Sequence, residues 1–110
     1  MTREVQFFVP QKFLREMEGV FTDEHLEALK GKLGLRPQLG ALIPGTGGAR
    51  KIWQLGERGQ SRVIYYYHPG TSEVVFLSCY AKNQKADLTK AEKDIARAII
   101  KTIKDARKVK

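Results

Sequence analysis

The chain has 110 residues with 42% hydrophobic and 29% charged content, which predicts one globular domain over residues 1–110 and not a disordered chain. No apolar run reaches the length of a membrane span, the N-terminus does not resemble a signal peptide, and the single cysteine excludes an internal disulfide, so we expect a cytoplasmic protein. The net charge of +8 is uneven, because residues 1–34 hold five Lys/Arg and six Asp/Glu whereas residues 35–110 hold fifteen and six, and this favours nucleic acid, an acidic protein or a membrane surface as partner.

The first third of the chain predicts a strand and two helices. Apolar and polar residues alternate over residues 3–9, which predicts a strand that ends at Pro10. Apolar residues at helical spacing then predict a short helix that stops at Gly19. Thr22 is a favourable N-cap for a second helix, which we expect to end at Gly34.

A glycine-rich turn and three strands follow. Residues 39–48 predict a turn or loop, and their GTGG run matches no phosphate-binding loop pattern. Strands are predicted over residues 49–55, 62–68 and 73–82. Strict alternation along the third strand divides it into a face toward the helices and an open face. The first set is Val75, Leu77, Cys79 and Ala81, and the second is Val74, Phe76, Ser78, Tyr80 and Lys82.

The last predicted element is a helix that begins at a capping box formed by Thr89 and Glu92. One of its sides is apolar and the other is basic, and the basic side either faces solvent or contacts RNA or a ribosome. The element order predicts an α+β fold: a mainly antiparallel sheet with the two N-terminal helices and the C-terminal helix packed on one face. The other face is expected to be the working surface.

Cations and aromatic residues are the remaining candidates for chemistry. Two histidines and one cysteine without ligand-like spacing predict neither a metal site nor a cofactor. Antiparallel pairing of the first two long strands is expected to bring Arg50 and Lys51 beside Arg62, and converging cations favour a bound anion such as phosphate. The full set is Arg50, Lys51, Trp53, Arg58, Arg62, Tyr66, Tyr80, Lys82 and Lys85.

This set of residue types is sufficient for cleavage of RNA. Cations around a phosphate stabilise the transition state, and aromatic rings stack on unpaired bases. The 2′-OH of RNA is itself a nucleophile, so metal-free cleavage needs only a base, an acid and charge stabilisation. A lysine among other cations can serve as base or acid. A basic surface that only binds RNA has the same composition, so both alternatives remain open.

Three blocks of the sequence resemble the RelE/HigB toxins of type II toxin–antitoxin systems. They are GTGGARKI at residues 45–52, RVIYYY at residues 62–67 and YAKNQKADLT at residues 80–89. The resemblance implies a RelE-like fold and a ribosome-dependent endoribonuclease that cuts mRNA and inhibits translation. It implies catalytic roles for Lys51, Arg62 and Lys82. The residues expected to bind RNA are Arg50, Trp53, Arg58, Tyr66, Tyr80, Asn83 and Lys85.

The resemblance also implies partners. They are the ribosome with its mRNA and a cognate antitoxin, which in this family often carries a helix-turn-helix domain. Operator DNA is expected to be bound only through the antitoxin. No membrane partner is expected. A gyrase-poisoning relative on the same fold and a non-catalytic RNA-binding module are the alternatives. The sequence departs from the family at Trp53, where a basic residue is common, and in the short loop before Arg62, where Arg58 is a substitute.

We expect both Arg62 and Trp53 to be exposed if they contact RNA. Arg62 is expected at the exposed head of its strand, with a surface salt bridge as its alternative role, so that its removal changes stability little. Trp53 lies on the same side of its strand as Lys51 if alternation is regular. It is then either a stacking platform for an mRNA base or, if the strand is turned the other way, a core residue.

Overall fold

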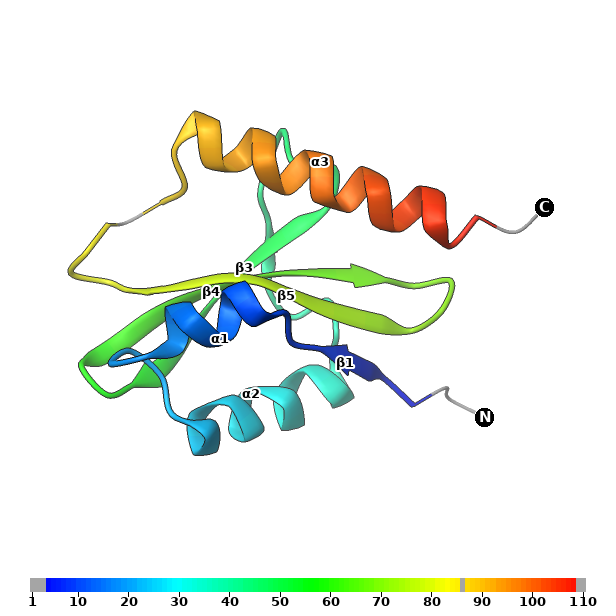
Figure 1. The fold of residues 1–110 in the computed structure, drawn as a ribbon. Coiled ribbons are helices and arrows are strands. Elements are labelled where there is room, and N and C mark those ends of the chain that lie inside the picture. The colour runs from blue at the N-terminus through cyan, green and yellow to red at the C-terminus, as the bar shows by residue number, and fades with distance from the viewer. Residues whose placement is uncertain (1–3, 86, 109–110) are drawn as a thin grey trace.

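A five-stranded sheet lies between helices in this computed structural model, which describes residues 4–85 and 87–108 (Figure 1). The elements are β1 (Gln6–Phe8), α1 (Gln11–Met17), α2 (Asp23–Leu35), β2 (Ala41–Leu42), β3 (Ala49–Gly56), β4 (Gly59–His68), β5 (Glu73–Ala81) and α3 (Lys90–Ala106). The strand order is β1-β5-β4-β3-β2, with β1 parallel to β5 and the other pairs antiparallel. The predicted α+β class with a mainly antiparallel sheet is confirmed.

The predicted boundaries differ from the structure only in detail. The first strand was expected over residues 3–9 and is described over Gln6–Phe8, while residue 3 itself and Ala86 of the third sequence block lie outside the described residues. The stretch predicted as a turn also contains the short strand β2, which pairs with Arg50 and Lys51 of β3. Among the described residues, no helix combines the length and apolarity needed to cross a membrane.

The glycine-rich turn before β3 is closed by a buried threonine. Thr46 Oγ1 donates to the carbonyl of Ile43 at 2.7 Å and accepts from the amide of Ala49 at 3.0 Å. Gly45, at a φ of 81°, and its neighbouring glycines adopt the left-handed conformation that residues with a Cβ avoid. This turn directs the chain into β3, which carries Lys51 and Trp53.

The packing of all helices on one face is the part of the fold expectation that is wrong. α1 and α2 pack on one face of the sheet, around Val63, Tyr65 and Phe76, whereas α3 packs on the opposite face, against Ile64 and Tyr66 (Figure 1). The physical reason lies in β4, where four consecutive large apolar residues are all buried. A strand buried on both sides needs cover on both faces of the sheet.

A β-bulge explains why the two predicted faces of β5 are wrong. The register between β4 and β5 shifts between Ile64 and Tyr65, because Ser78 pairs with Ile64 but Phe76 pairs with Tyr65. The extra residue reverses the alternation along β5. The side chains that join the core under α1 and α2 are Val74, Phe76, Cys79 and Ala81, while Val75, Leu77 and Tyr80 join the core under α3.

A partly buried ion pair joins the end of α3 to the start of β5. Arg107 donates from Nε and Nη2 to the two carboxylate oxygens of Glu73, at 2.7 and 2.9 Å. These hydrogen bonds lower the pKa of Glu73 from its ordinary value of 4.5 to about 2. The Glu73 side chain is 10% exposed and that of Arg107 is 29% exposed, so the pair is partly shielded from water.

Replacing Glu73 by glutamine should therefore lower the free energy of unfolding by about 1–3 kcal/mol at pH 7, because Arg107 loses its buried counter-charge. Since the folded pKa is depressed, the wild-type advantage is complete above pH 4.5 and is lost as the pH falls toward about 2. Urea denaturation at several pH values measures this. Asp105→Asn, which removes the same charge from an exposed pair with Lys101, should have a smaller effect; equal losses in both variants would contradict the assignment.

Candidate active site

Three neighbouring strands bring four candidate residues together. Trp53 of β3 lies opposite Arg62 of β4, and Arg62 lies opposite Tyr80 of β5. Lys51 is two residues before Trp53 on β3, so its side chain leaves the sheet on the same side. Opposed residues of antiparallel strands have Cβ atoms about 5 Å apart. The strand register therefore gathers these four side chains on the face of the sheet that carries α3.

A cationic cleft is centred on Lys51 and Arg62. It has a volume of about 150 Å³ and is lined by Ile43, Pro44, Lys51, Arg62, Ile64, Tyr80, Asp87, Leu88 and Lys93. Asp87 Oδ1 lies 3.2 Å from Nζ of Lys51 and 3.4 Å from Nη1 of Arg62. The hydrogen bond from Lys51 and the nearby positive charges lower the pKa of the Asp87 carboxyl. An ionised carboxylate thus lies between two cations in the cleft.

Arg62 is buried, which corrects the expectation of an exposed strand head. The residue is 8% exposed, and its guanidinium lies 3.8 Å from the ring centroid of Trp53. Among the described residues, Nε of Arg62 and the hydroxyl of Tyr80 are buried without a hydrogen-bond partner. Burial raises the pKa of Tyr80, so its hydroxyl keeps its proton at neutral pH. A buried cation with an unfilled donor is costly and fits a site that receives an anion.

Trp53 lies at the surface beside the cleft. It is 38% exposed, so it is not a core residue, and strand alternation does place it with Lys51 as expected. Lys82 Nζ lies 5.5 Å from the Trp53 ring centroid. The indole therefore contacts two cations, Arg62 and Lys82, and orders both side chains through cation–π contacts.

The comparisons with known proteins concern the fold. No protein-family model matches the sequence. A solved structure of the E. coli toxin RelE, an arginine-to-alanine double mutant in the free state, superposes with a TM-score of 0.57 at 16% sequence identity, covering 90% of this chain and 98% of that chain. This chain has the RelE fold. The predicted RelE-like architecture is confirmed, and the cationic cleft lies on that fold.

Three residues expected to bind RNA lie apart from the cleft in this RelE-like chain. Arg50 leaves β3 on the side opposite Lys51, where its guanidinium donates to the carbonyls of Gln38 and Gly40. Arg58 lies in the β3–β4 hairpin with its guanidinium beside Gly19. Tyr66 is 4% exposed, and its hydroxyl is hydrogen-bonded to His68. None of the three side chains is positioned to share an anion with Lys51.

The third sequence block lies next to the cleft. Lys85 is ion-paired with Glu92, and its Nζ lies 4.7 Å from the Tyr80 ring centroid. Lys85 therefore packs against Tyr80, which lines the cleft. Asn83 is exposed in the turn after β5, and Lys82 reaches back over Trp53. In Figure 1 this connection runs from the end of β5 up to the start of α3.

The sequence-based candidates omit two residues of the cationic cleft. Asp87 belongs to the third block but is not among the candidates, because no paired carboxylates stand out in the sequence. Lys93 belongs to the basic side of the last helix, yet it lines the cleft together with Asp87. A single acid inside a basic block is the signal that points to Asp87.

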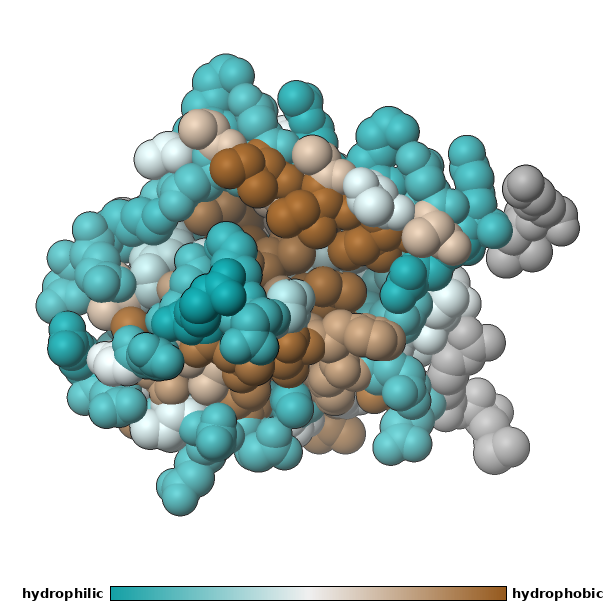
Figure 2. Space-filling model, in the orientation of Figure 1, coloured by the Kyte–Doolittle hydropathy of each residue, from teal (hydrophilic) through white to brown (hydrophobic). Residues whose placement is uncertain are grey.

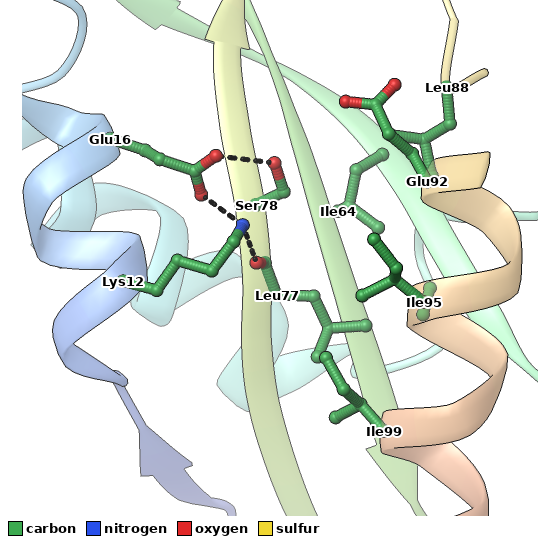
Figure 3. Close-up of a pocket in the computed structure, with 10 residues that line it drawn as sticks. Lys12, Glu16, Ile64, Leu77, Ser78, Leu88, Glu92, Ile95 and Ile99 are labelled. Atoms are coloured by element: carbon green, nitrogen blue, oxygen red, sulfur yellow. Dashed lines mark hydrogen bonds and ion pairs between the residues drawn. The ribbon is translucent and has the colours of Figure 1, made fainter.

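An apolar groove adjoins the cationic cleft. It has a volume of about 220 Å³, lies between α1 and α3, and shares Ile64 and Leu88 with the cleft (Figure 3). Figure 2 shows apolar side chains gathered on the underside of α3. Two residues of α3 that line the groove, Ile95 and Ile99, are 57% and 38% exposed (Figure 3). Lys12, its rim cation, already bonds Glu16 at 3.0 Å. The groove thus lacks the open cations that an RNA backbone needs.

Trp53→Ala should weaken RNA binding more than stability, because the indole orders Arg62 and Lys82. We expect the affinity for a single-stranded RNA oligonucleotide to fall about 10- to 100-fold, as lost cation–π and base-stacking contacts predict. The free energy of unfolding should fall by about 1–2 kcal/mol, below the 3–5 kcal/mol of a fully buried aromatic. Titration with a labelled oligonucleotide and chemical denaturation measure the two quantities. Trp53→Phe keeps a ring under Arg62 and should retain most of the affinity; if it does not, the site requires the indole itself.

Proposed function

We propose that this chain, as a single toxin domain over residues 1–110, is the toxin of a type II toxin–antitoxin system and a ribosome-dependent mRNA endoribonuclease of the cytoplasm. The observation that carries the proposal is the buried Arg62 guanidinium, which shares the cationic cleft with Lys51 and already contacts a carboxylate. A phosphodiester bears its charge on oxygens that accept the same hydrogen bonds as a carboxylate. The RelE fold and the three sequence blocks support the same assignment.

The proposed reaction is attack of a ribose 2′-OH on the adjacent phosphorus. The P–O5′ bond breaks, a 2′,3′-cyclic phosphate forms, and one proton moves from the 2′-OH to a base while another moves from an acid to the leaving 5′-oxygen. Arg62 stabilises the charge that builds on the non-bridging oxygens, and Tyr80 can donate a further hydrogen bond. Lys51, which shares the cleft with Arg62, and Lys82, which lies over the Trp53 ring, are the proposed proton carriers.

Expression in bacteria is the direct test of this function. Growth should stop, and mRNA mapped by primer extension should be cut only when it is being translated. In a cell-free translation reaction, cleavage should persist with a chelator that is selective for transition metals, because the proposed reaction uses no metal and such a chelator leaves the Mg²⁺ that ribosomes need. DNA damage without mRNA cuts would instead favour gyrase poisoning. If the protein binds RNA on translating ribosomes but leaves it intact, the protein is a non-catalytic RNA-binding module.

The proposed protein partner is a cognate antitoxin. A surface with this excess of cations attracts an acidic segment, and the exposed Ile95 and Ile99 next to the cleft offer apolar contact area. We propose that such an antitoxin carries a helix-turn-helix domain and brings the pair to operator DNA. A small gene beside this one whose product restores growth would support the proposal, and a lone gene would count against it.

A further inference from the structure

The anion in the cationic cleft belongs to the protein itself. Asp87 contacts Lys51 and Arg62 through one oxygen, Oδ1. Its side chain is 61% exposed, whereas that of Arg62 is 9% exposed. The cations are therefore held by the sheet, and their counter-ion is held from the solvent side. A substrate phosphate that uses Lys51 and Arg62 has to take the place of this carboxylate.

We propose that Asp87 is an internal competitor for the phosphate site, whose carboxylate must leave Lys51 and Arg62 before a phosphodiester binds. The inference rests on the proposed function, because it concerns how that site admits its substrate. Asp87 opposes every anion equally at the cleft. Specificity then depends on the contacts that a ligand makes outside the cleft. Only a strand whose neighbouring phosphates and bases add contacts outside the cleft displaces Asp87 readily.

The exchange is favourable for a phosphate on hydrogen-bonding grounds. Asp87 offers Oδ1 to both cations and leaves Nε of Arg62 and the hydroxyl of Tyr80 without partners among the described residues. A phosphodiester has two non-bridging oxygens and can accept from more of these donors. Lys93, which lines the cleft from α3, adds a further cation for that second oxygen.

Release of the carboxylate is inexpensive. The Asp87 side chain is 61% exposed, so water solvates its charge once it separates from the two cations. The Asp87 side chain can turn into solvent, where its charge is fully hydrated, without any change in β3 or β4. Arg62 cannot follow it, since the guanidinium is buried against Trp53.

Binding of a fluorescent 2′-deoxy trinucleotide, which lacks the 2′-OH and is not cleaved, tests the inference in the full-length protein. Asp87→Asn should tighten binding about three- to tenfold at low salt. Asp94→Asn is the matched control, since it removes the same charge from α3 at a side chain paired with Lys90 and Arg97. It should change the affinity less than twofold.

The outcomes separate the inference from the proposed function. Equal tightening by both variants would reduce the effect to net charge and overturn the inference while the function stands. Weaker binding by Asp87→Asn would also overturn it and would make Asp87 a positioning residue for Lys51 and Arg62. Absence of binding by the wild type and both variants would overturn the inference, whereas mapping of cleaved mRNA on translating ribosomes decides the proposed function separately.

Discussion

Arg62→Met should abolish growth inhibition and mRNA cleavage while leaving the fold at least as stable as the wild type. Loss of one preorganised donor at a developing anion typically lowers a rate by about 10²–10³-fold. Methionine keeps the apolar contact with Trp53 but removes a buried cation whose Nε has no partner among the described residues. Replacing such a charge by an apolar side chain of similar length is often neutral or stabilising. Quantitative growth assays and urea denaturation measure the two effects.

Two further variants sharpen this experiment. Arg58→Met removes the same charge from the hairpin beside Gly19, away from the cleft, and should remain toxic. Arg62→Lys keeps the charge but loses the planar fork of donors, so it should restore little activity. A fully toxic Arg62→Met protein would eliminate Arg62 from the site. If it unfolds instead, the main role of Arg62 is structural.

Phe76→Ala should have the largest effect on stability, about 3–5 kcal/mol. Phe76 is fully buried, and its ring lies 6.1 Å from that of Phe7 and 5.1 Å from that of Phe13. It therefore joins β5 to both β1 and α1, and its removal leaves a cavity that these rigid neighbours cannot fill. Calorimetry or chemical denaturation of the purified variant measures the loss.

Phe8→Ala is the matched control for Phe76→Ala, because it removes the same atoms from the surface. Phe8 is 43% exposed on β1, and its ring is 5.9 Å from the guanidinium of Arg107. We expect a loss of about 1 kcal/mol or less, since surface substitutions rarely cost more. Similar losses for both phenylalanines would show that the core around Phe76 is packed more loosely than the structure indicates.

Features that depend on a few consecutive residues could be predicted from the sequence. The capping box at Thr89 is confirmed, with Glu92 donating its amide at 3.2 Å. Thr22 caps α2 as expected, although His25 completes that capping box in place of an acid. The three long strands were predicted within a few residues, because turn residues and alternation are local signals.

Features that depend on pairing between distant residues could not be predicted as well. The register shift between Ile64 and Tyr65 reverses which side chains of β5 face each side of the sheet, and no residue type in β5 predicts this shift. Register also decides the site, because it brings Trp53 and Tyr80 to Arg62. Arg50 is turned to the other side of the sheet by alternation along β3, which is a local signal. Asp87 reaches the cleft from the connection before α3, a path that alternation does not describe.

The parallel pairing of β1 with β5 delays folding of the chain during its synthesis. Gln6 is made early in translation, but its partner Glu73 is made 67 residues later. Until then β1 has no strand beside it, and the apolar side chains of α1 lack Phe76. Lys93 of the cleft follows later still. A nascent chain therefore cannot close this core, or complete the cleft, while most of the chain is still being made.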